Sequence, residues 1–138
     1  MFFGIKKKKI ESFDTISFHT SGMRHSTYYD IVNKDGEAEI TQYHIKRSED
    51  IKERVIEKQA VCDADGFIKL LNDCGVMSWD GFYGKHPRGV RDGTMFDFSA
   101  TVNGGVEISA RGSQNFPRHY RDFTDGLHGF LNNGENGR

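Results

Sequence analysis

"MFDFSATVNGGVEISARG" (residues 95–112) contains two strand patterns and the turn that joins them. Apolar and polar side chains alternate on both sides of Asn103-Gly104-Gly105, a sequence typical of hairpin turns. Such alternation is typical of an antiparallel sheet that is covered on one face only. The apolar positions are Phe96, Phe98, Ala100, Val102, Val106, Ile108 and Ala110. We therefore expect helices on the face that carries these side chains.

Three further strands are predicted in the first half of the chain. The segment that begins at Phe13 alternates, and residues 25–32 are rich in β-branched and aromatic side chains. Lys34-Asp35-Gly36 predicts a hairpin turn, after which residues 38–45 alternate again. In the first of these strands, Ile16 and Phe18 are expected on one face, and Phe13, Thr15, Ser17 and His19 on the other.

Residues 53–62 fit two alternatives, because a charged segment precedes them and breaks the alternation. They are either a strand or the end of a helix that begins near Ser48, and a strand is favoured for their second half. A helix is then predicted after Asp63, a residue type that caps helix N-termini. Its apolar stripe is Phe67, Leu70, Leu71 and Cys74, and Gly75 supplies the left-handed residue that often ends a helix.

"ARGSQNFPRHYRDF" (residues 110–123) is interpreted as a strand-to-helix junction. Gly112-Ser113 is a turn pair, and Pro117 suits the first position of a helix, where its missing N–H is no loss. Phe116 is expected to pack on the following apolar stripe, which is Tyr120, Phe123, Leu127, Phe130 and Leu131. A reactive loop is disfavoured, because the passage lacks the second glycine of a nucleophile elbow and the Gly-Lys-Ser/Thr of a phosphate loop.

The fold class that follows is α+β, with an antiparallel sheet of about five to six strands and two helices packed on one face. The chain has 138 residues, which is an ordinary size for one domain. The single domain is predicted to span residues 1–138, with residues 1–10 and 132–138 frayed.

Charge and cysteine content exclude several classes of protein. The net charge is −1, so the strongly basic character of a nucleic-acid-binding domain is missing. Cys62 and Cys74 fit no zinc or redox spacing and favour a reducing compartment, which predicts a cytoplasmic protein. No apolar run is long enough to cross a membrane. A weak contact of Lys6–Lys9 with an anionic membrane surface is an alternative to a solvated terminus.

Four segments in the second half form a pattern together: a Trp-containing loop, an aromatic strand, Asn-Gly-Gly, and Gly-Ser-x-x-Phe-Pro before an amphipathic helix. The pattern resembles a family of small, uncharacterised bacterial α+β proteins, some cytosolic and some exported lipoproteins, in which a strand ending in Gly-Ser-Asn-x-Phe/Tyr-Pro leads into a terminal helix. Gln114 replaces the Asn of that motif. The resemblance covers residues 75–131, implies a bacterial origin and this fold, and assigns no activity.

The candidate site is the loop of residues 76–94, because long irregular loops are often functional. An indole, an imidazole, carboxylates and guanidinium groups gather there, as they do in binding clefts. The candidate binding residues are Trp79, Asp80, Tyr83, His86, Arg88 and Asp92. The structural alternative is that Trp79 closes the core and that the two Asp-Gly pairs form turns.

Other kinds of site have weaker support. The six histidines lack metal-ligand spacing, so no metal or other cofactor is expected. Tyr28, Tyr29 and Tyr43 on adjacent strands are suited to stacking bases, but the near-zero net charge argues against nucleic acid as a partner. The leading hypothesis is therefore a non-catalytic binding or protein-interaction module, with another protein or a second copy of the chain as its partner. The alternative is a small-molecule-binding protein or small enzyme with a cleft near Trp79, His86 and Asp92.

Overall fold

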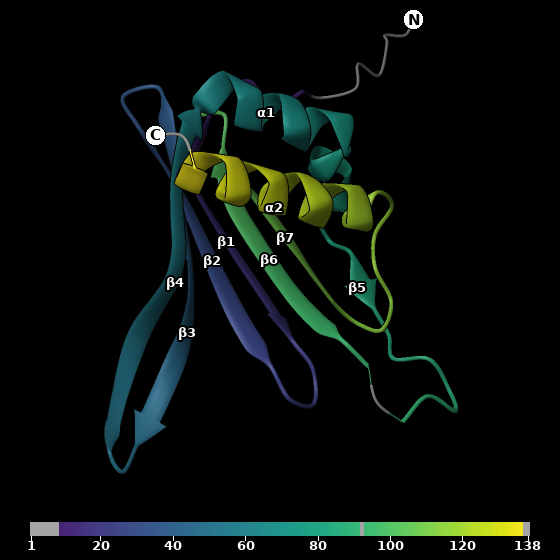
Figure 1. Ribbon diagram of the computed structural model, residues 1–138. Coiled ribbons are helices and arrows are strands. Elements are labelled where there is room, and N and C mark those ends of the chain that lie inside the picture. Colours follow the sequence, from purple (N-terminus) through teal and green to yellow (C-terminus); the bar gives the residue numbers. More distant parts are fainter. Residues whose placement is uncertain (1–8, 92, 137–138) are drawn as a thin grey trace, which may run out of the picture.

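A computed structural model of the chain describes residues 9–91 and 93–136. Within these residues the fold is α+β, with one sheet of seven strands and two α-helices (Figure 1). The strands are β1 (Phe13–Ser21), β2 (Ser26–Lys34), β3 (Glu37–Ser48), β4 (Ile51–Asp63), β5 (Tyr83–Gly84), β6 (Met95–Val102) and β7 (Val106–Ser113). Their order in the sheet is β4-β3-β2-β1-β6-β7-β5.

The sheet is mostly antiparallel, and it is larger than the five to six strands predicted. The additional strand is β5, two residues that pair parallel to β7 inside the segment predicted to be irregular. Such a short strand has no detectable sequence period. The parallel pairing makes the sheet mixed.

β4 is a strand over its whole length, so the alternative of a helix beginning near Ser48 is wrong. It pairs with β3 from Ser48 opposite Ile51 to Glu37 opposite Asp63. The ladder has one register shift, between Gln42 and Tyr43, and it stabilises an extended backbone that the charged local sequence does not indicate. In Figure 1 this long hairpin projects beyond the part of the sheet that the helices cover.

Both helices lie on the same face of the sheet (Figure 1). α1 (Ala64–Asp73) buries Phe67 and Leu71 completely, and α2 (Tyr120–Asn136) does the same with its central apolar side chains, Phe123, Leu127 and Leu131. Leu70 is only half-buried and lies beside Gly126 of the second helix. Asp63 precedes α1 in an extended conformation, but its side chain makes no capping hydrogen bond. The predicted position is thus right and the predicted hydrogen bond is wrong. No helix in the described ranges is both long and apolar enough to cross a membrane.

A β-bulge corrects the predicted orientation of Phe13. The register between β1 and β6 shifts between Phe13 and Thr15, so that Asp14 is an extra residue. The shift turns Phe13 to the same face as Ile16, and the ring is 2% exposed. Alternation alone places Phe13 on the opposite face, because a bulge breaks the two-residue period without a clear sequence signal.

The junction between β7 and α2 crosses over two glycines. A Cβ atom added to Gly84 or to Gly112 would lie 2.3 Å from the backbone oxygen of Asn115, so only glycine allows this crossing. α2 begins at Tyr120 and not at Pro117, because His119 has a φ of 66° and interrupts the helical backbone. The helix then continues to Asn136, through most of the segment predicted to be frayed.

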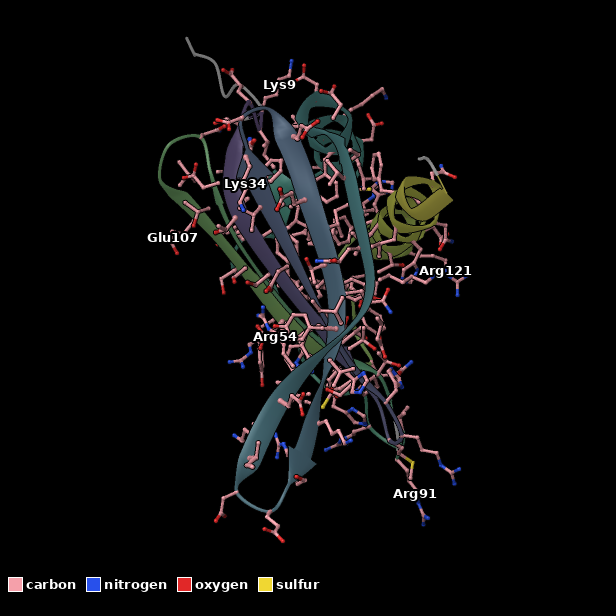
Figure 2. The ribbon with its side chains drawn as sticks, turned by 60° about the vertical axis from the view of Figure 1, so that its left-hand side comes forward. Lys9, Lys34, Arg54, Arg91, Glu107 and Arg121 are labelled. Atoms are coloured by element: carbon pink, nitrogen blue, oxygen red, sulfur yellow. The ribbon has the colours of Figure 1, made fainter. Side chains whose placement is uncertain are left out.

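The opposite face of the sheet is covered by neither described helix, and we call it the helix-free face. It carries the side chains that alternate with the core residues, such as Ser17, Tyr28 and Ser99. Figure 2 shows Arg54 on this side of the sheet and Arg121 on the side of the helices. Any site built from strand side chains without helix contacts therefore lies here.

Candidate functional site

The structure separates the residues predicted for the loop site into two groups. Trp79 ends a short 3-10 helix (Val76–Trp79), is 1% exposed and packs edge-on against Phe98 and Phe123. Its indole N–H donates to the backbone oxygen of Arg118 at 3.1 Å. Asp80 accepts a hydrogen bond from the backbone N–H of Ser109 at 2.9 Å. These two residues hold the loop and the core together.

Tyr83 and His86 line a hollow on the helix-free face, which Trp79 does not reach. Arg88 is exposed outside this hollow. Asp92 lies outside the described residues, as do Lys6, Lys7 and Lys8 of the predicted membrane contact. Trp79 and His86 therefore do not line a common cleft.

The sheet aligns one side chain from each of its seven described strands in a single row across the helix-free face. The strand registers give this alignment directly, since each residue is the partner of the next. The cross-sheet row consists, from β4 to β5, of Ile56, Tyr43, Tyr28, His19, Asp97, Arg111 and Tyr83. It is apolar and aromatic at one end and charged near the other.

The aromatic part of the row is a continuous stack. The rings of His19 and Tyr28 are nearly parallel, with centroids 4.0 Å apart and an interplanar angle of 4°. Tyr28 stacks in turn on Tyr43, with centroids 5.2 Å apart. The guanidinium carbon of Arg54 lies 4.0 Å from the centroid of Tyr43, and a guanidinium N–H group donates to the tyrosine hydroxyl and to Asp30. The rings thus stand on the sheet with their faces turned toward their neighbours in the row.

This stack limits one function that the sequence suggested. Base stacking on a sheet requires ring faces that are open to solvent. The faces of Tyr28 are covered by its two neighbours, and Tyr43 is only 7% exposed beneath Arg54. Tyr29, the third tyrosine considered, points to the helices and bonds His128 at 2.8 Å. The three tyrosines therefore do not form a platform for bases.

The charged part of the row is an exposed ion pair beside the stack. Arg111 donates to Asp97 at 3.3 Å, and both side chains are more than half exposed. Exposed pairs of this kind contribute little to stability. Burial lowers the pKa of His19, against the opposing effect of the nearby Asp97 carboxylate. Its imidazole is therefore neutral at pH 7, and one ring nitrogen bonds the hydroxyl of Ser26 at 2.7 Å.

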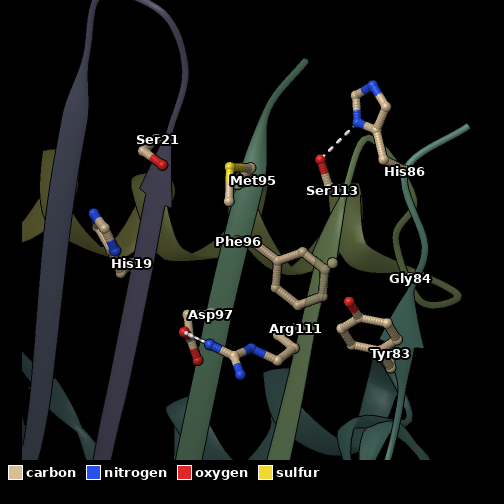
Figure 3. Close-up of a pocket in the computed structure, with 11 residues that line it drawn as sticks. His19, Ser21, Tyr83, Gly84, His86, Met95, Phe96, Asp97, Arg111 and Ser113 are labelled. Carbon is tan, nitrogen blue, oxygen red and sulfur yellow. Dashed lines mark hydrogen bonds and ion pairs between the residues drawn. The ribbon is translucent and has the colours of Figure 1, made fainter. Parts of the chain in front are cut away.

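A hollow of about 460 Å³ lies over β1, β6, β7 and β5, where the stack gives way to the charges. In Figure 3 the imidazole of His19 is seen edge-on at one side of the hollow, with Tyr83 at the other side and Asp97 and Arg111 between them. Ser21, Ser113 and His86 add polar groups to the rim, and Met95 adds an apolar one. The volume falls within the range of small-molecule sites.

His86 connects the loop to this hollow. Its two ring nitrogens face the hydroxyl of Ser113 at 2.7 Å and the backbone oxygen of Val90. A carbonyl only accepts hydrogen bonds, so the nitrogen that faces Val90 carries a proton and donates to it. The described contacts of His86 include no carboxylate that would orient it as a base, so it fastens the loop to β7.

His19, Asp97 and Arg111 were not among the predicted site residues. The signal available was their alternation with core residues, which places them on the polar face but does not align them across strands. Alignment depends on register, which hairpin lengths and the bulge at Asp14 set. The histidines also give no metal centre: the described part of the chain contains no cluster of three or more His, Cys, Asp or Glu residues with suitable placement.

Comparison with known proteins finds no family model, no curated protein and no solved structure that matches this chain. The cross-sheet row and its hollow therefore provide the basis for a functional assignment.

Proposed function

We propose that the protein binds a small molecule in the hollow on the helix-free face. The observation that carries this proposal is the cross-sheet row, which turns a stacked aromatic ring, a carboxylate and a guanidinium toward one concave surface. Small-molecule sites combine such a hollow with a few polar groups that fix the orientation of the ligand. The small-molecule alternative from the sequence is thus preferred here, with its site moved from the loop onto the sheet.

Binding without catalysis is the form of this proposal that the contacts support. A nucleophile needs a base, and the base needs a group that orients it. Ser113 and His86 meet the first condition, but the orienting partner of His86 is a backbone carbonyl on the loop. Asp97 instead pairs with Arg111, on the neighbouring strand. The arrangement holds a ligand by stacking and hydrogen bonds.

The test is an NMR titration of the ¹⁵N-labelled protein with a set of small planar and non-planar compounds. Binding compounds are expected to shift the amide signals of β1, β6 and β7 next to the hollow. Arg111→Ala should weaken that binding, whereas Arg121→Ala, on the exposed side of α2, should leave it unchanged. Shifts confined to another surface, or no shift with any compound, would contradict the proposal.

Self-association through β4 is a second candidate, which retains the interaction hypothesis from the sequence. β4 is an edge strand of the described sheet, and Ile51, Ile56 and Val61 on it are 64%, 53% and 51% exposed. An edge with exposed aliphatic side chains is able to pair with another strand. A second copy of the chain is the proposed partner. Light scattering should then give the mass of a dimer for the wild type and the mass of a monomer for Ile56→Lys. A wild-type protein that is monomeric at all concentrations would exclude self-association through β4.

A reducing cytoplasmic location is also part of the proposal. Cys62 and Cys74 are free, and burial raises the pKa of both thiols to about 11. Thiols with such a high pKa remain protonated at neutral pH and react slowly. They are therefore suited to a structural role in a compartment without disulfides.

A further inference from the structure

The aromatic stack is closed at one end and open at the other. Arg54 covers the outer face of Tyr43 at 4.0 Å. At the other end, one face of the His19 ring is covered by Tyr28, and the ring borders the hollow. The next position in the row is Asp97, a short side chain that rises less far from the sheet than a ring does. The stack therefore ends beside the exposed ion pair of Asp97 and Arg111, in which the guanidinium donates to the carboxylate at 3.3 Å.

The distance between the strands that carry His19 and Arg111 allows one planar group between these two side chains. β1 and β7 are separated by β6, so His19 and Arg111 stand two strand spacings apart, or about 9.6 Å. A ring in contact with planar groups on both faces needs about 7 Å between them. Arginine stacks on aromatic faces, and its long side chain accommodates the remaining difference. A flat ligand fits between the imidazole and the guanidinium once Arg111 leaves Asp97, and breaking this exposed ion pair costs little. The edge of the ligand then takes the place of Arg111 on the carboxylate.

The carboxylate selects the edge of the ligand. A carboxylate only accepts hydrogen bonds and is best satisfied by two adjacent N–H donors. Guanine presents such a pair on its Watson–Crick edge, from the ring N1 and the exocyclic amino group. Adenine presents a bare ring nitrogen at the same place, which repels a carboxylate. Asp97 therefore favours guanine among the purines.

The loop beside the hollow has the charge that a phosphate requires. Residues 85–91 include Lys85, Arg88 and Arg91 and contain no acidic residue. His86 of the same segment lines the hollow and donates to Val90 through one ring nitrogen. Positive charge next to a concave surface raises the local concentration of anionic ligands. A phosphate attached to the ligand would thus lie on the side of this loop.

We propose that the hollow binds a guanine nucleotide, with the base between His19 and Arg111 and its Watson–Crick edge on Asp97. This proposal rests on the proposed small-molecule function and names the class of ligand. The nucleotide is either free or the exposed end of an oligonucleotide, since both present the same base and phosphate.

The experiment is isothermal titration calorimetry of the full chain with GMP, IMP, AMP and guanosine. GMP should bind most tightly, IMP more weakly because it lacks the amino group, and AMP at least about tenfold more weakly than GMP. Guanosine should bind more weakly than GMP, and added salt should reduce this difference. A short single strand that ends in guanosine 5′-phosphate distinguishes the two sources: equal or tighter binding than GMP indicates nucleic acid, and weaker binding indicates the free nucleotide.

Two variants with matched controls test the assigned contacts. Asp97→Asn should weaken GMP binding about tenfold or more and remove the preference over AMP, whereas Asp50→Asn at the tip of the β3–β4 hairpin should change neither. His19→Ala should weaken binding roughly tenfold by loss of stacking, and His25→Ala serves as its control. Circular dichroism confirms that each variant is folded.

Several results would overturn the guanine proposal. One is the absence of heat and of NMR shifts with millimolar GMP, and another is equal binding of GMP and AMP. A third is unchanged GMP affinity in folded Asp97→Asn and His19→Ala. If other compounds still shift the signals of the hollow, only the ligand class is wrong. If no compound does, the small-molecule function is wrong as well.

Discussion

Phe123→Ala tests the packing of α2 on which the whole arrangement depends. The Phe123 ring is fully buried and makes edge-to-face contacts with Phe18, Trp79 and Phe98, at centroid distances of 5.5, 5.5 and 5.7 Å. Removing a buried Phe side chain costs about 3–5 kcal/mol in the free energy of unfolding. We expect a loss near the upper end of this range, about 4–5 kcal/mol. Each of the three edge-to-face pairs stabilises the fold beyond the effect of burying the ring.

Urea denaturation measures this loss, with Trp79 fluorescence and circular dichroism as probes. With a slope of about 2 kcal/mol/M, the unfolding midpoint should fall by about 2 M. Phe130→Ala is the matched control, since its ring is only partly buried on the same helix and should cost about 1–2 kcal/mol. A loss below about 1 kcal/mol for Phe123→Ala, or a larger loss for the control, would refute the packing described here.

Three further predictions concern the core, a histidine and the crossing between β7 and α2. Trp79→Phe should cost about 2 kcal/mol in the free energy of unfolding, because the oxygen of Arg118 loses its indole donor, and no measurable loss in a urea melt would contradict the core assignment. Burial lowers the pKa of His128, so this residue contributes stability that is complete above its unfolded value of 6.5 and is lost as the pH falls below it. His128→Gln should therefore lose less stability between pH 7.5 and 5.5 than the wild type does. Identical dependence of stability on pH in urea melts of the two proteins would contradict the lowered pKa of His128. Gly112→Ala should cost about 1–3 kcal/mol through its clash, whereas Gly129→Ala, with open space around its Cβ, should be neutral or stabilising in thermal melts.

The sequence predicted the elements of the fold where one period governs a long segment. The alternation of Phe96, Phe98 and Ala100 and the helical stripe through Phe123 and Leu127 reach their expected burial. The predictions failed where long-range contacts override local pattern. The charged first half of β4 is extended because β3 pairs with it, and Phe13 turns inward because of the bulge at its neighbour.

The site was harder to predict than the fold. Trp79 and His86 are close in sequence, but in the fold the indole lies in the core and His86 lies on the opposite face of the sheet. His19, Asp97 and Arg111 are far apart in sequence and become neighbours through strand register alone. A one-residue change of register would reverse the face of a whole strand, so no local pattern specifies such a row.

The crossing of Asn115 over Gly84 and Gly112 joins the two sides of the sheet mechanically. Its backbone leads into α2 on one side, and Gly84 follows Tyr83, the last member of the row on the other side. The backbone of Asn115 approaches both strands so closely that no side chain fits at Gly84 or Gly112. The segment that leads into the final helix and the short edge strand are therefore packed backbone against backbone, so a side chain introduced at either glycine would push both apart.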